Sequence, residues 1–190
     1  MDAFENVIAS ILHRSGYWTR TSFKVELTKE EKREIGRPST PRWELDVIGY
    51  SSRRQEIIVV ECKSYLDSPG VRCDVFAGTN PEGEANYKLF CDETLRRVVM
   101  RRLSIQLFEA SLCPENTPVQ LCLAAGKVYG GDEDKLKQLF VERGWQLWTP
   151  SFIRAQLQGL RSAGYENDVA TVVAKLLLRE SARSSPKHTT

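Results

Sequence analysis

Apolar residues recur with two different spacings over the first 27 positions. Over residues 3–15 the apolar side chains recur every three or four positions, which places them on one face of a helix: Phe4, Val7, Ile8, Ile11 and Leu12. Gly16 stands where a helix commonly ends. Residues 17–27 then alternate, with Phe23, Val25 and Leu27 on one face and Ser22, Lys24 and Glu26 on the other, which is typical of a half-exposed strand.

Two further apolar runs, 43–50 and 56–63, are separated by the polar residues 51–55 and predict a β-hairpin. The second run is unusual. Ile57 to Val60 are four consecutive β-branched residues, typical of a buried strand, yet Glu61 and Lys63 follow in the same strand. Charged side chains are rarely placed in a core unless they are paired or bind something.

The remaining pattern completes a mixed α/β domain, a single sheet covered by helices on both faces. Residues 28–42 predict a loop or a short, frayed helix, and 67–84 are rich in turn residues. The later elements are a long helix over 85–112, a strand over 119–125, a helix over 132–143, a strand over 145–148, a helix that begins at Thr149-Pro150 and a last helix over 166–180. We therefore divide the chain into a core (1–149), a helical extension packed on it (150–180) and a tail (181–190) predicted to be disordered.

Composition narrows the class of protein. A net charge of +2 does not by itself indicate a nucleic-acid-binding protein, and no run of about 20 apolar residues predicts a membrane span. The N-terminus lacks the pattern of a signal peptide, and five cysteines without a Cys-x-x-Cys pair favour a reducing compartment, so a cytoplasmic protein is expected. Two histidines, His13 and His188, exclude a histidine-dependent nuclease, and no phosphate-binding loop or serine hydrolase arrangement is recognisable.

The hairpin concentrates the candidate chemistry. Glu61 and Lys63 share a face of their strand, and Glu44 and Asp46 share a face of its partner. Either carboxylate of the first strand could approach Glu61. Neighbouring carboxylates repel one another unless a positive charge lies between them, and oxygen ligands suit magnesium. Two acids and a lysine around a magnesium ion indicate metal-assisted hydrolysis of a phosphodiester.

This arrangement resembles the PD-(D/E)XK nuclease superfamily, whose fold is restriction-endonuclease-like. The motif reads Leu45-Asp46 on one strand and Glu61-Cys62-Lys63 on the next, with Leu45 in place of the proline. Family members often carry a glutamate on the first helix, where this chain has Glu5. The order helix, three strands, helix, strand over residues 3–125 also matches the family core.

The resemblance implies a role for each matching residue. Asp46 and Glu61 would bind Mg²⁺ or, in its place, Mn²⁺, with the backbone carbonyl of Cys62 as a third ligand. Lys63 would position the attacking water and stabilise charge on the phosphate. Glu5 would complete the outer metal sphere or a second metal site.

Further residues are predicted to contact the substrate. Tyr65 could lie along the substrate path, and Arg97 and Arg101, which share a helix face, would contact phosphates. Trp145 and Trp148 are read as core residues, although an exposed tryptophan could stack on bases.

Simpler interpretations remain open. Glu61 and Lys63 could form a surface ion pair, Asp46 could cap the turn, and Glu44 could replace Asp46 as the functional acid. Glu5 could be an acid favoured by the helix dipole, and Tyr65 could serve packing alone.

The expected function is a magnesium-dependent nuclease that hydrolyses DNA as an endonuclease. A chain of this size leaves little room for a separate recognition domain, so we expect low sequence specificity, a homodimer or a targeting partner protein. The alternative is a catalytically silent nuclease-like module that binds nucleic acid or scaffolds a complex.

Overall fold

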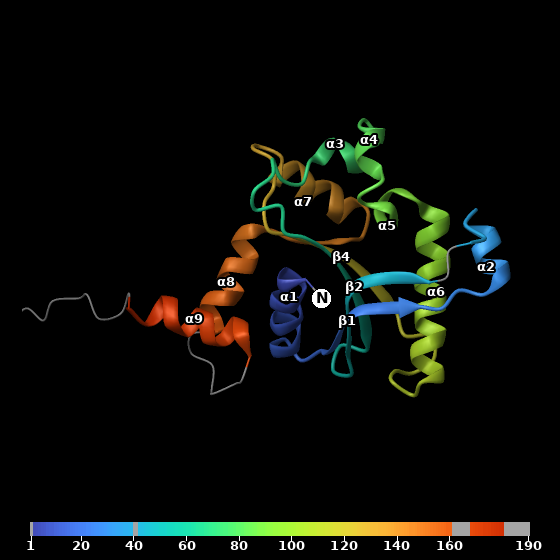
Figure 1. Cartoon of the computed structure of the whole chain (residues 1–190), viewed down its shortest axis with the longest axis horizontal. Coiled ribbons are helices and arrows are strands. Elements are labelled where there is room, and N and C mark those ends of the chain that lie inside the picture. Colours follow the sequence, from blue (N-terminus) through green and yellow to red (C-terminus); the bar gives the residue numbers. More distant parts are fainter. Residues whose placement is uncertain (1, 40–41, 161–167, 181–190) are drawn as a thin grey trace, which may run out of the picture.

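The computed structural model describes residues 2–39, 42–160 and 168–180, and its centre is one five-stranded mixed sheet (Figure 1). The strands lie in chain order: β1 (Trp18–Val25), β2 (Trp43–Ser51), β3 (Glu56–Lys63), β4 (Val119–Ala125) and β5 (Gln146–Trp148). β1 with β2 and β2 with β3 form antiparallel pairs, whereas β3 with β4 and β4 with β5 form parallel pairs. The predicted α/β class and the hairpin are confirmed.

Helix α1 (Ala3–Arg14) covers one face of the sheet, and its apolar side chains Ile8, Ile11 and Leu12 are almost fully buried. They pack on Ile58 and Val60 of β3, which point to the same face. Two further helices, α8 (Pro150–Leu160) and α9 (Val169–Glu180), pack against each other and beside α1. Figure 1 shows these two helices outside α1, on the side away from the sheet.

The long helix α6 (Glu93–Glu109) covers the opposite face, where the larger hydrophobic core lies. Helix α2 (Lys29–Glu34) lies beside α6, and the short helices α3 (Cys73–Phe76), α4 (Pro81–Glu84) and α5 (Lys88–Cys91) gather with α7 (Glu133–Glu142) at one end of the molecule (Figure 1). An aromatic cluster fills the core at that end: Phe76, Tyr87, Phe90, Phe140 and Trp145.

The single helix predicted over 85–112 is wrong, because the chain forms two helices there. Asp92 has extended backbone angles (φ −105°, ψ 102°), and its side chain accepts a hydrogen bond of 2.8 Å from the N–H of Leu95. It therefore caps the start of α6 and separates that helix from α5. The apolar rhythm of the sequence continues across this break, because both helices bury side chains in the same core.

Other expectations are refined by the structure. Residues 28–42 contain the short helix α2, which begins with a capping box between Thr28 and Glu31. Trp148 is buried and Trp145 packs against the core, as predicted. The tail 181–190 and the start of the last predicted helix lie outside the described residues. No helix in the described part of the chain combines the length and apolar character that a membrane crossing requires.

Candidate active site

The hydrogen-bonded pairing of β2 with β3 ends at the predicted motif. The paired positions run from Ser51 with Glu56 to Val47 with Val60, and the next pair, Asp46 with Glu61, is not formed. Instead the Asp46 carboxylate accepts a hydrogen bond of 2.7 Å from the backbone N–H of Cys62. The strands separate here, and Asp46 is fixed against the backbone between Glu61 and Lys63.

A second irregularity lies on the other side of Asp46. The pairing of β1 with β2 skips Ser22 and Asp46, and Ser22 has a positive φ of 49°, a conformation uncommon for a serine. The Ser22 hydroxyl lies 3.4 Å from a carboxylate oxygen of Glu5 on α1 and donates to it. This bend therefore brings the first helix and the second strand to the same region.

Glu61 and Lys63 form a close, largely buried ion pair. The Lys63 Nζ lies 2.8 Å from a Glu61 carboxylate oxygen, and the two side chains are only 19% and 18% exposed. An exposed ion pair at a strand end would contribute little and need no such burial. The interpretation as a surface pair is therefore not supported.

Burial and neighbouring negative charges disfavour the ionised forms of the acids in this region. Burial and the charge of Asp46 raise the pKa of Glu5. Burial also raises the pKa of Asp46, although the Cys62 N–H and Lys63 oppose the shift. For Glu61, burial and the nearby Asp46 outweigh the attraction of Lys63, so its pKa is raised as well. Burial alone would lower the pKa of Lys63, but its bond to Glu61 and the charge of Asp46 raise it.

The charges favour a cation, although the carboxylates do not form a complete cage. Glu5, Asp46 and Glu61 carry three potential negative charges against the single ammonium of Lys63. Within residues 2–39, 42–160 and 168–180, no three Asp, Glu, His or Cys side chains converge as ligands for one ion. Magnesium is commonly held by one or two carboxylates and water, so Asp46 and Glu61 with the Cys62 carbonyl suit it.

Tyr87 is a site residue that sequence reasoning missed. The Lys63 Nζ lies 5.7 Å from the centroid of the Tyr87 ring, within the range of a cation–π interaction. Tyr87 is 4% exposed, and its pKa is raised first by burial and then by its neighbour Tyr65. Tyr65 thus packs beside the site through Tyr87. Tyr87 falls in the helix predicted over 85–112, and no pattern in the sequence indicated this contact.

Gly126 fixes the backbone after the motif. Its N–H donates a 2.8 Å hydrogen bond to the carbonyl of Lys63. A Cβ at this position would lie 2.3 Å from the carbonyl oxygen of Ser64, so only glycine allows the segments that follow β3 and β4 to approach this closely. The parallel pairing of β3 with β4 therefore continues to Lys63 and holds its backbone in place.

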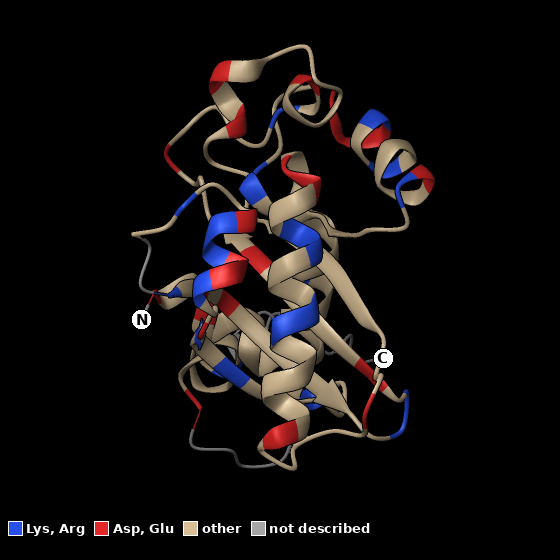
Figure 2. Ribbon diagram, turned by 90° about the vertical axis from the view of Figure 1, so that its right-hand side faces the viewer, with Lys and Arg blue, Asp and Glu red and all other residues tan. Residues whose placement is uncertain are grey.

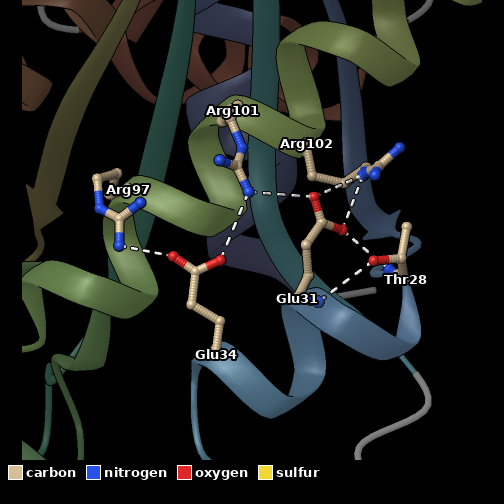
Figure 3. Close-up of polar contacts among 6 residues, drawn as sticks. All are labelled: Thr28, Glu31, Glu34, Arg97, Arg101 and Arg102. Carbon is tan, nitrogen blue, oxygen red and sulfur yellow. Dashed lines mark hydrogen bonds and ion pairs between the residues drawn. The ribbon is translucent and has the colours of Figure 1, made fainter.

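The arginines predicted to bind phosphates are engaged with α2 instead (Figure 3). Arg97 lies 2.6 Å from Glu34, and Arg101 lies 3.6 Å from both Glu31 and Glu34. Arg102 lies 2.9 Å from Glu31, whose side chain is only 6% exposed. Figure 2 shows the resulting mixture of basic and acidic segments on this face. The network fastens α2 to α6, and the structure does not bring these arginines to Asp46.

Glu44 differs from Asp46 in its surroundings. Glu44 is exposed on β2, whereas Asp46 is partly buried and bonded to Cys62. The geometry therefore favours Asp46 as the functional acid of this strand.

Comparisons with known proteins return no relative: no family model matches the chain, and no curated protein or solved structure matches it.

Proposed function

We propose that the chain is a metal-dependent nuclease of the restriction-endonuclease-like class that hydrolyses phosphodiester bonds of DNA. The observation that supports this most directly is the junction of β2 and β3, where Asp46 is bonded to the Cys62 N–H beside the buried Glu61–Lys63 pair. Apart from the short helices α2 to α5, the elements follow the order of that class: one helix and three antiparallel strands, then a helix and a parallel strand.

Each residue of the site has its own role in the proposed reaction. Asp46 and Glu61 would hold Mg²⁺ together with the Cys62 carbonyl. When bound, the ion would lower the pKa of water and offset the charge of the phosphate. The raised pKa of Lys63 keeps its side chain an ammonium at neutral pH, so it acts as a hydrogen-bond donor to water or phosphate and not as a base. Glu5, a carboxylate with a raised pKa, is suited to accept a proton from water.

Cleavage of plasmid DNA in the presence of Mg²⁺ or Mn²⁺ tests the proposal. We expect the wild-type chain to nick or linearise the plasmid and a chelator to abolish cleavage. Asp46→Asn and Lys63→Ala should each lower the rate about a hundredfold or more, because each removes charge from the reacting centre. Glu44→Ala is the matched control: it removes an exposed acid two positions from Asp46 and should leave the rate unchanged.

Two outcomes would contradict the proposal. Cleavage that persists in both Asp46→Asn and Lys63→Ala would show that the activity does not arise at this site. A wild-type chain that binds DNA but cleaves neither DNA nor RNA with either ion would favour the catalytically silent module.

A further inference from the structure

Among the described residues, the Lys63 ammonium group makes an ion pair with Glu61 and a cation–π contact with Tyr87, and the charges of Asp46 and Tyr65 also act on it. Of the first two partners, only Tyr87 remains free to hold it during the proposed reaction. The first partner is the Glu61 carboxylate, at 2.8 Å. If Glu61 binds a divalent cation, its negative charge is shared with that ion and its hold on Lys63 weakens. The second partner is the ring of Tyr87, which carries no net charge that the cation could compete for.

Lys63 needs such a second partner because of its own flexibility. A lysine side chain has four methylene groups and loses considerable rotamer entropy when it is fixed. A catalytic donor must lie within a few tenths of an ångström of its productive position, and small displacements reduce the rate strongly. The Gly126 bond fixes the backbone of Lys63 but not its ammonium group.

Tyr87 directly precedes α5, and backbone hydrogen bonds hold it on both sides. Its N–H donates to the carbonyl of Glu84 at 2.9 Å, and its own carbonyl accepts the N–H groups of Phe90 and Cys91. The ring packs edge-on against Phe76, with centroids 4.8 Å apart.

We infer that Tyr87 is a positioning residue for Lys63: its buried ring, packed against Phe76, holds the ammonium group by a cation–π contact while Glu61 engages the metal. This inference rests on the proposed function for its catalytic consequence, but the contact itself is independent of any activity. The ring, and not the hydroxyl, carries the role.

The test combines spectroscopy with kinetics. Protons that lie over the face of an aromatic ring resonate upfield, so the side-chain CH₂ groups next to Nζ of Lys63 report the contact directly in a carbon–proton NMR spectrum of lysine-labelled protein. Lys63→Arg identifies the signal by its disappearance. We expect an upfield signal in the wild-type chain and in Tyr87→Phe, and its loss in Tyr87→Leu.

The kinetic arm uses the same variants. Tyr87→Leu should lower kcat about tenfold or more with little change in KM, because it disturbs the donor and not the binding of substrate. Tyr87→Phe keeps the ring and should retain most of the wild-type kcat. Phe90→Leu is the matched control, since it removes a buried ring of the same aromatic cluster that does not face Lys63.

Three results would overturn the inference: a Lys63 signal without an upfield shift in the wild-type chain, a shift that persists in Tyr87→Leu, or a loss of kcat in Phe90→Leu as large as in Tyr87→Leu. The first needs no variant and decides the question even if Tyr87→Leu does not fold. A wild-type chain without nuclease activity would refute the proposed function, whereas the NMR signal would still decide whether Tyr87 holds Lys63.

Discussion

At the scale of single residues, the ionised form of Asp46 lowers the stability of the fold. Its pKa is raised in the folded protein by burial, so the folded state binds a proton more readily than the unfolded chain does. Stability is therefore lost as the pH rises from the ordinary carboxylate range, near 4, through the raised pKa. The pKa values of Glu5 and Glu61 are raised as well, so their ionisation also lowers the stability of the fold. A bound cation would offset this loss of stability for all three acids.

We predict that Asp46→Asn is more stable than the wild-type chain at pH 7 in a chelator, while it loses the proposed activity. The amide oxygen can still accept the Cys62 N–H, but the buried charge is gone. At pH 3, where the carboxylate is protonated in both states, the difference should vanish. Mg²⁺ at a hundred times its dissociation constant should stabilise the wild-type chain by about 2–3 kcal/mol and Asp46→Asn much less. Thermal unfolding with and without metal measures both effects.

Glu31→Gln serves as the control, because its expected effect on stability is opposite to that of Asp46→Asn. Burial would raise the pKa of Glu31, but its bonds to Arg102 and to the backbone of Thr28 lower it below the usual value. Its contribution to stability is therefore present above about pH 4 and lost as the pH falls. Glu31→Gln should cost about 2–4 kcal/mol at neutral pH, since it leaves Arg102 without its carboxylate. If Asp46→Asn were also destabilised at pH 7, the acids would not form an unbalanced negative site.

The sequence was sufficient to place Asp46, Glu61 and Lys63 together, because the period of a strand and one short turn determine which side chains face one another. It could not place Tyr87, which the sequence pattern assigns to a long helix over 85–112 and whose approach to Lys63 depends on the tertiary fold of the segment that precedes α5. The same holds for Arg97 and Arg101: their partner Glu34 is more than 60 positions away in the chain, and no local pattern links the two.

At the scale of elements, the parallel pair β3–β4 carries Lys63 and limits its movement. The pairing runs from Ile57 with Val119 to Lys63 with Ala125. Directly after the last pair, Gly126 lies close to the backbone of Ser64. The position of Lys63 thus depends on Gly126, a residue directly after β4 and far along the chain that has no reactive side chain.

We predict that Gly126→Ala lowers stability by about 2–3 kcal/mol, because the added methyl group would overlap the Ser64 carbonyl and force the strands apart. Cleavage should fall on the order of tenfold to a hundredfold, since Lys63 moves with the displaced backbone. Gly130→Ala is the matched control: nothing lies within 4 Å of its added Cβ, and we expect neither effect. Chemical denaturation and plasmid cleavage check the pair. Equal losses in both variants would disprove a specific role for the Gly126 contact.

The break between α5 and α6 shows why some element boundaries escape a hydrophobic pattern. Leu89, Phe90 and Leu95 all enter the same core, so their spacing resembles one continuous helix. The boundary is set by Asp92, a residue type that both caps helices and occurs on their exposed faces. Only the tertiary structure distinguishes these two uses.

At the scale of the whole molecule, α1 connects the candidate site to the C-terminal helices. Glu5, in its first turn, approaches Ser22 beside Asp46. Ser10 lies further along the same helix and donates a hydrogen bond of 2.8 Å to Asp168, the residue that precedes α9. Asp168 also accepts the N–H and hydroxyl of Thr171 and so caps α9 while it binds α1.

This arrangement predicts that α9 can be loosened without disturbing the site. Asp168→Ala removes both the cap and the link to α1 and should cost about 1–2 kcal/mol, whereas Ser10→Ala removes the link alone and should cost less. Hydrogen exchange should rise in α9 in both variants, and more in Asp168→Ala. Cleavage should be unchanged, because Ile8, Ile11 and Leu12 hold α1 on the sheet independently of α9, at 0–2% exposure. A parallel loss of cleavage in Asp168→Ala and Ser10→Ala would instead show that α9 positions Glu5 through α1.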